Sequence, residues 1–177
     1  MTSEADSRNM RRALDLAKEA LDQGELPIAA IIVIDDRIIS QAHNQVKGRN
    51  DLLGHAEILS IQVVIAGPTQ YRMEERKKMT LYSTLEPCMM CFGAIMAYNI
   101  GRLCYALRSP GDGVLPIVNQ WERKSEQLPF YKVPDVFSGV LDKESAQLFK
   151  DFSELHPRHF LSKWANELSK VAEVKML

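Results

Sequence analysis

The stretch TLYSTLEPCMMCFGAIMAYNIGRLCYAL, residues 80–107, decides the fold. Its first six residues are rich in Thr, Tyr and Leu, which is typical of a short strand. Pro87 suits the first turn of a helix, and the apolar residues after it predict that this helix runs to Gly101. RLCYAL, residues 102–107, predicts the next strand. A strand, a helix and a strand in this order indicate an α/β fold.

The flanking sequence extends this alternation. Two β-branched runs broken by Asp35 and Asp36 predict a hairpin over residues 27–44. Gly and Pro bound the remaining elements, and residues 71–79 form a charged connection. Further helices are predicted over residues 4–23, 55–67, 114–124, 143–155 and 158–177, and a last strand over residues 135–141. The order predicts a three-layer α/β/α domain with helices on both faces of one mixed sheet.

Composition restricts the class of protein. Apolar residues make up 46% of the 177 residues and the formal net charge is -1, which is ordinary for a globular protein and gives no global attraction to nucleic acid. The three cysteines suit a reducing compartment. The chain has no run of eighteen apolar residues and no apolar region at its N-terminus, so we expect a cytoplasmic protein with no membrane partner.

Cys88 and Cys91 are the most informative pair of residues. They could form a redox couple, half of a structural zinc site or half of a catalytic one. The thioredoxin-like order that a redox couple needs is absent. A structural site needs a fourth protein ligand, for which His43 and Cys104 are the candidates, whereas a catalytic site keeps three ligands and a water. His55 begins one predicted helix as the cysteines begin another, so the three side chains can meet at one edge of the sheet.

Glu57 lies two residues after His55. A structural zinc site has no use for this carboxylate, but hydrolysis of an aromatic C–NH₂ bond does. The metal lowers the pKa of a bound water towards about 7, and a carboxylate that is not a ligand can carry protons to the ring nitrogen and to the departing ammonia. His-x-Glu followed by Pro-Cys-x-x-Cys is the signature of zinc deaminases that act on nucleobases.

The sequence resembles the cytidine-deaminase-like superfamily, in particular its branch of guanine, cytosine and tRNA-adenosine deaminases. The matching stretches include HAEIL (55–59), LYSTLEPCMMCFGAIMAYNIGRLCYAL (81–107) and GVLDKESAQLFKDF (139–152), and cover about residues 10–155. The resemblance implies a mixed five-stranded sheet, one Zn²⁺ per chain and a homodimer. The roles it implies are zinc binding by His55, Cys88 and Cys91, proton transfer by Glu57, and substrate binding by Asn44, Ala56, Leu85 and Glu86.

We expect residues 1–157 to form the deaminase domain and residues 158–177 to form an amphipathic helix that packs on it or on a dimer partner. Phe152, Phe160 and Trp164 could cover the active site, or could be a plain core or dimer stripe. For Asn44 the alternative is a turn residue closing the hairpin, and for Glu86 a structural carboxylate.

The substrate is the open question. The loop LRSPGDGVLPIVNQWERK, residues 107–124, departs from the loop of wobble-adenosine deaminases. Four basic residues balance four acidic ones between residues 108 and 135, and six balance six between residues 142 and 177, so no footprint for a polyanion is visible. These observations favour a free purine base, with guanine first on resemblance alone, or its nucleoside. The alternatives are wobble adenosine in tRNA and a zinc module without activity that binds RNA or protein.

Overall fold

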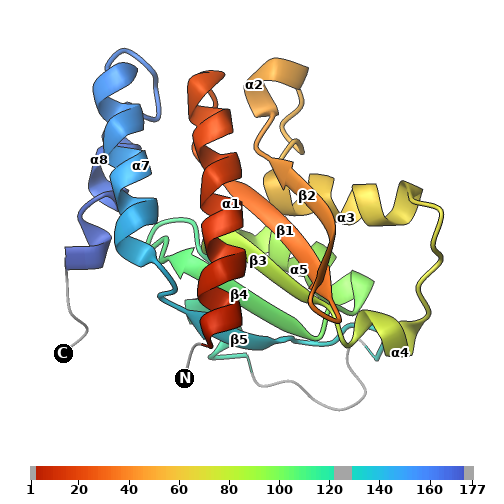
Figure 1. Ribbon diagram of the computed structural model, residues 1–177. Coiled ribbons are helices and arrows are strands. Elements are labelled where there is room, and N and C mark those ends of the chain that lie inside the picture. The colour runs from red at the N-terminus through yellow and green to blue at the C-terminus, as the bar shows by residue number, and fades with distance from the viewer. Residues whose placement is uncertain (1–2, 122–128, 174–177) are drawn as a thin grey trace.

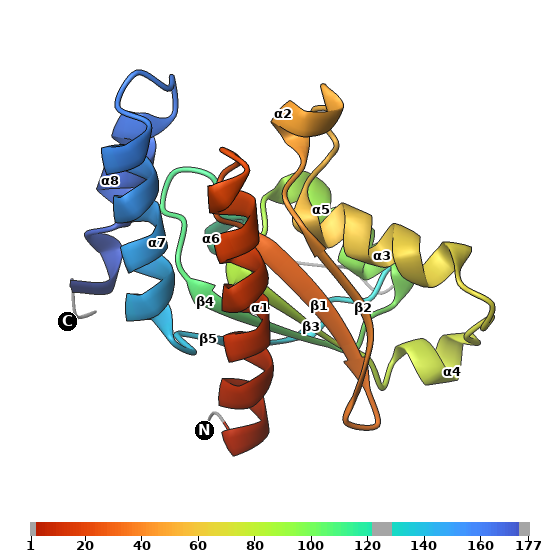
Figure 2. The ribbon, with the colours of Figure 1, turned by 45° about the horizontal axis from the view of Figure 1, so that its top comes forward.

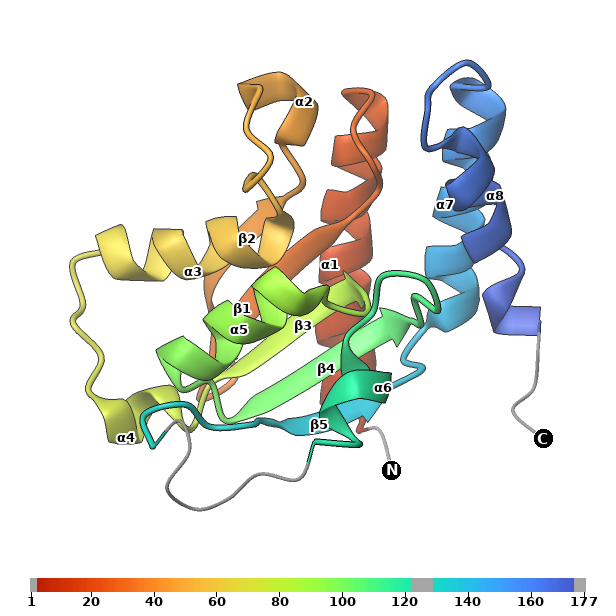
Figure 3. The same cartoon turned by 180° about the vertical axis from the view of Figure 1, so that it is seen from behind.

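A computed structural model of the chain describes residues 3–121 and 129–173. It contains five strands in one sheet, with helices on both faces (Figures 1 and 3). In chain order the elements are α1 (Glu4–Asp22), β1 (Ala29–Ile34), β2 (Arg37–His43), α2 (Val46–Arg49), α3 (Ala56–Ala66), α4 (Met73–Arg76), β3 (Thr80–Leu85), α5 (Met89–Tyr98), β4 (Arg102–Leu107), α6 (Leu115–Val118), β5 (Asp135–Ser138), α7 (Asp142–Leu155), α8 (Ser162–Leu168) and the 3-10 turn η1 (Val171–Glu173). The predicted α/β/α architecture with a mixed five-stranded sheet is confirmed.

The strand order is β2-β1-β3-β4-β5. β1 pairs antiparallel with β2 and β3, whereas β3, β4 and β5 are parallel to one another. The predicted hairpin is therefore β1–β2. Asp35 and Asp36 both have positive φ, at 48° and 59°, as a tight turn between twisted strands requires.

Helices bury both faces of the sheet, which explains why the strands are apolar without alternation. On one face α1, α7 and α8 cover Ile31, Tyr82 and Cys104, and on the other α3 and α5 cover Ile32 and Leu81. Figure 2 shows α1 and α7 on one side of the strands and α3 and α5 on the other. Within residues 3–121 and 129–173, none of the helices is both long and apolar enough to cross a membrane.

Several boundaries differ from the prediction. The charged connection contains the short helix α4, and α2 follows the hairpin without having been predicted. α5 begins at Met89 with Cys88 as its N-cap, so Pro87 lies before the helix instead of in its first turn. β5 ends at Ser138 because Gly139 and Leu141 have positive φ. The helix predicted over residues 114–124 is reduced to α6, and residues 122–128 lie outside the described residues.

The C-terminal segment packs on its own chain. α8 lies against α7, and Trp164, Ala165 and Leu168 contact the core. The helix predicted over residues 158–177 is reduced to α8 and η1, and residues 174–177 lie outside the described residues. Phe149 and Trp164 meet edge to face with ring centroids 5.8 Å apart. The boundary at residue 157, which separates this segment as a unit of its own, stays a prediction.

Candidate zinc site and substrate cavity

Two helix N-termini bring the predicted metal ligands together. His55 is the N-cap of α3 and Cys88 is the N-cap of α5, with Cys91 in the first turn of the same helix. The positive end of a helix dipole favours the thiolate form of a cysteine, so this position suits a metal ligand. α5 follows β3 closely, whereas α2 and a loop, which the sequence did not predict, separate α3 from β2.

The three side chains fit one zinc ion. The Nδ1 atom of His55 lies 3.8 Å from Sγ of Cys88 and 3.5 Å from Sγ of Cys91, and the three ligand atoms are all within 4.8 Å of one another. Ligands of a tetrahedral zinc with bonds of about 2.0–2.3 Å are themselves about 3.3–3.8 Å apart. One nitrogen and two sulfurs at these separations are therefore positioned to bind a single Zn²⁺.

Among the residues that the structure describes, none supplies a fourth ligand to this metal site, so the fourth coordination position is open to a non-protein ligand. Cys104 is fully buried in β4 on the opposite face of the sheet. His43 has its Nδ1 atom 2.8 Å from the carbonyl oxygen of Asn44 and is not part of the cluster. Three protein ligands and an open position are characteristic of catalytic zinc sites, and four of structural sites.

The protonation of the thiols also suits a metal. Hydrogen bonding to Cys91, together with a hydrogen bond to His55, lowers the pKa of Cys88 to about 4. Hydrogen bonding to Cys88 and burial raise the pKa of Cys91 above its usual range. Binding of zinc displaces the proton that the pair retains and holds both sulfurs as thiolates.

Glu57 lies beside the ligands but is not one of them. Its side chain is 3% exposed, the hydroxyl of Ser83 donates to Oε1 at 3.1 Å, and Oε2 lies 3.4 Å from Sγ of Cys91. Burial raises the pKa of Glu57 above its usual range. A carboxyl group that takes up a proton more readily than usual is suited to general acid/base work near neutral pH.

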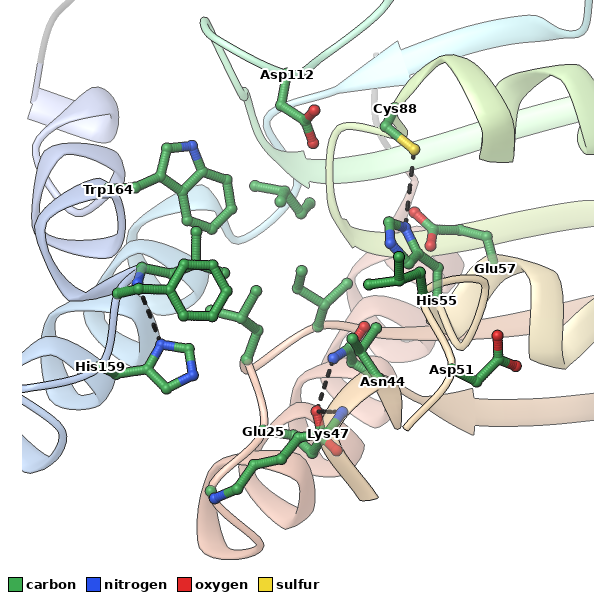
Figure 4. A pocket seen from close by; sticks show the side chains of 18 of the residues that line it. Glu25, Asn44, Lys47, Asp51, His55, Glu57, Cys88, Asp112, His159 and Trp164 are labelled. Atoms are coloured by element: carbon green, nitrogen blue, oxygen red, sulfur yellow. Dashed lines mark hydrogen bonds between the residues drawn. The ribbon is translucent and has the colours of Figure 1, made fainter. Parts of the chain in front are cut away.

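A cavity of about 650 Å³ opens beside this cluster. The side chains of His55, Glu57 and Cys88 form one wall, and His159 and Trp164 lie on the opposite side (Figure 4). The C-terminal segment of the same chain adds His159, Phe160, Leu161 and Trp164 to the lining, a role that the sequence analysis left open beside a plain core or dimer stripe. Phe152, in contrast, is fully buried in the core.

The four predicted substrate-binding residues differ in what they can offer a substrate. Asn44, Leu85 and Glu86 line the cavity. Ala56 is buried at the first position of α3, where a backbone N–H has no acceptor within the helix. The carboxylate of Glu86 is already engaged, because it accepts the N–H groups of Ser109 and Leu115, each at 3.0 Å.

Several residues of the cavity carry no local signal in the sequence. Glu25, Lys47, Asp112 and His159 line it, and each comes from a different segment. Glu25 reads as the solvated end of a helix, and Asp112 as one more polar residue in a Gly-rich loop. Only their positions in the folded chain reveal that they line the same cavity as Asn44.

Comparison with known proteins gives the deaminase family that the sequence resembles. Residues 3–107 match the family model described as cytidine and deoxycytidylate deaminase zinc-binding region. The tRNA-specific adenosine deaminase of Agrobacterium fabrum (strain C58 / ATCC 33970) is 36% identical over 143 residues, which is 81% of this chain and 90% of that protein.

Solved structures also match. One, from a study of A-to-I editing by tRNA:A34 deaminases at the wobble position of transfer RNA, has a TM-score of 0.65 and 34% identity, covering 80% of this chain and 99% of the other. A guanine deaminase from Bacillus subtilis has a TM-score of 0.55 and 30% identity, covering 75% and 86%.

Proposed function

Because this chain belongs to the cytidine and deoxycytidylate deaminase family and is a zinc-binding hydrolase, we propose that it converts adenosine to inosine at the wobble position of tRNA. The observation that supports this most strongly is the 36% identity to a tRNA-specific adenosine deaminase across nine-tenths of that protein's length. The relatives therefore favour the alternative of the sequence analysis over its first choice, guanine.

The balance of charges along the sequence does not argue against this substrate. That count covered residues 108–135 and 142–177 and omitted Lys47, which lies on the rim of the cavity with His159. An exposed Phe160, with 85% of its surface accessible, lies at the same rim. Lys47 is a cation and Phe160 an exposed aromatic ring, and such groups can contact the phosphates and stack on the bases of a single-stranded nucleic acid.

A second candidate, deamination of free guanine, is favoured by the C-terminal segment. Phe160, Leu161 and Trp164 give the cavity an apolar wall, and pockets for small ligands are mostly apolar with a few directed polar groups. The match to a guanine deaminase at 30% identity supports the same candidate.

The reaction proposed for this site is hydrolysis. His55, Cys88 and Cys91 would hold the zinc, which when bound activates a water for attack on the amino-bearing ring carbon. The oxygen of water forms a bond to C6 of adenine, the C6–N bond breaks, and the nitrogen leaves as ammonia. Glu57 takes a proton from the water and delivers it to the ring nitrogen, then transfers a second proton to the departing amine.

The other residues of the cavity bind the substrate and exclude water. Asn44 offers directed hydrogen bonds to the substrate, the N–H of Ala56 offers a donor beside the zinc ligands, and Leu85 supplies an apolar contact. Glu86 contributes by holding the backbone of the cavity wall at Ser109 and Leu115.

A substrate comparison tests the proposal. Zinc-loaded protein is incubated with an anticodon stem-loop carrying adenosine at the wobble position, with the same stem-loop carrying guanosine there, and with free guanine, adenine, cytosine and their nucleosides. We expect inosine only in the adenosine stem-loop, with an affinity that falls steeply as salt is raised. Turnover of guanine with an untouched stem-loop would replace the first candidate by the second.

We also propose a homodimer that packs through the α3–α5 face. The resemblance implies a dimer, and Val63 and Ile65 on α3 and Met89 at the start of α5 are apolar side chains between 49% and 57% exposed that an interface on these helices would cover. Light scattering at micromolar concentration is expected to give twice the mass of the chain, and a monomer at that concentration contradicts the proposal.

A further inference from the structure

The carboxylate of Glu25 is buried at the lining of the substrate cavity, in the connection between α1 and β1. Only 5% of the residue is exposed. Its Oε2 atom accepts hydrogen bonds from the side-chain Nδ2 of Asn44 at 3.0 Å and from the backbone N–H of Lys47 at 3.3 Å. Its Oε1 atom accepts a hydrogen bond from the backbone N–H of Gly48 at 2.6 Å. A single carboxylate thus connects α1, the end of β2 and the helix α2.

This carboxylate has no partner of opposite charge within 4.0 Å among residues 3–121 and 129–173. It is also outside the group of metal ligands. Burying an anion without a counter-ion is unfavourable unless hydrogen bonds stabilise it, and here three N–H donors do so. The contact with Asn44 joins the anion to the substrate cavity.

The contact fixes which end of the Asn44 carboxamide faces the cavity. An ionised carboxylate accepts hydrogen bonds and donates none, so only the amide nitrogen of Asn44 can face Glu25. The backbone of Asn44 is held as well, since its N–H donates to the carbonyl of Ile28 at 2.8 Å. In Figure 4 the nitrogen of Asn44 points to Glu25 and its oxygen points towards His55.

We infer that Glu25 is a positioning residue, which holds the carboxamide of Asn44 so that Oδ1 faces the bound substrate as an acceptor. The inference rests on the proposed deaminase activity of this site but not on which base it accepts. In the free protein the orientation is set before the substrate arrives, so an N–H or O–H of the substrate meets an acceptor that needs no reorientation.

The substitution Glu25→Gln tests the inference. The glutamine has one oxygen for the donors of Asn44, Lys47 and Gly48. The contact with Gly48 is the shortest of the three, at 2.6 Å, and an oxygen kept there turns the NH₂ of the glutamine towards Nδ2 of Asn44, so that two donors face each other. The contact is restored when Asn44 turns over, which directs Nδ2 at the cavity. We expect kcat/KM to fall by about tenfold or more, the usual scale for a lost directed hydrogen bond, with zinc content unchanged.

A double-mutant cycle separates positioning from a purely structural role. In the Asn44→Ala background, Glu25→Gln is expected to change kcat/KM by less than about twofold, because the group through which it acts is gone. An equal loss in both backgrounds overturns the inference. Glu144→Gln, which removes an exposed carboxylate on α7, is the matched control and is expected to leave kcat/KM unchanged.

Two measurements are independent of turnover. The side-chain NH₂ resonances of Asn44 in ¹⁵N-labelled, zinc-loaded protein are expected to move in Glu25→Gln and not in Glu144→Gln. Resonances that stay in place overturn the inference, even if the stem-loop assay rejects adenosine as substrate. The paired variant Glu25→Gln/Asn44→Asp recreates a donor–acceptor contact, so it is expected to be more stable than Glu25→Gln alone, and a paired variant of equal or lower stability argues against the contact.

Discussion

Replacing Glu86 by Gln is expected to loosen the wall of the cavity without touching the zinc ligands. Glu86 is 3% exposed, and its two oxygens accept the N–H groups of Ser109 and Leu115 at 3.0 Å each. The loop between these residues wraps the carboxylate so closely that a Cβ added to Gly113 would lie 2.2 Å from its Cδ. Gln keeps one acceptor and places an NH₂ group against the other N–H.

The size of the effect follows from these contacts. Losing one charge-assisted hydrogen bond and leaving one buried N–H unsatisfied costs about 3 kcal/mol in the free energy of unfolding. For a chain of this length each kcal/mol lowers the melting temperature by about 2–4 °C, so we expect a drop of about 6–12 °C. The amides of residues 109–115 are expected to exchange hydrogen faster than in the wild type.

Thermal unfolding of the zinc-loaded protein, together with hydrogen exchange, measures both effects. The control is Glu144→Gln, because Glu144 and Arg11 form an ion pair with side chains 43% and 50% exposed, and such pairs contribute about 0–1 kcal/mol. A melting temperature of Glu86→Gln within 2 °C of the wild type, with unchanged exchange over the loop, refutes the assignment of Glu86 as the anchor of this wall.

Three further predictions concern the metal, the proton and the N-terminal helix. Purified protein is expected to hold about one zinc per chain by elemental analysis, and Cys88→Ala to lose it; full occupancy in that variant contradicts the ligand assignment. Glu57→Gln is expected to keep zinc and fold while activity falls at least about a hundredfold, and near-normal turnover would assign the proton to another group. Burial alone would raise the pKa of Asp6, but hydrogen bonds from Arg102, Ser3 and Tyr82 hold it well below its usual range. A carboxylate with a lowered pKa stabilises the fold above its unfolded pKa of about 3.9 and loses this contribution as the pH falls towards its folded pKa. The gap in melting temperature between wild type and Asp6→Asn is therefore expected to stay constant from pH 7 to about pH 5 and to close below about pH 4, and a gap that widens in acid contradicts this.

The sequence alone determined the layered architecture and the metal cluster. The strands are encoded locally, as apolar runs that are covered on both faces. The metal ligands meet across 33 and 36 positions of the chain, and they were visible because His-x-Glu followed by Pro-Cys-x-x-Cys is a motif with a known chemistry. Glu57 was equally visible, because it lies on the same helix as His55, two residues further along. Short segments with strong periodicity carry such information within themselves.

The short elements were less visible in the sequence. α2 and α4 contain four residues each, too few to show a helical period. The end of β5 depends on the positive φ of Gly139 and Leu141, and the identity of a leucine does not reveal such a backbone.

Only the tertiary structure decided the walls of the cavity. Glu25 meets Asn44 across 19 positions of the chain, and the backbone N–H of Ser109 meets Glu86 across 23. His159 and Trp164 reach the cavity because α8 packs on α7. Each of these residues is an ordinary polar or apolar residue in its own segment. Its role arises from burial beside a partner distant in sequence, and burial depends on how the elements pack and not on any local pattern.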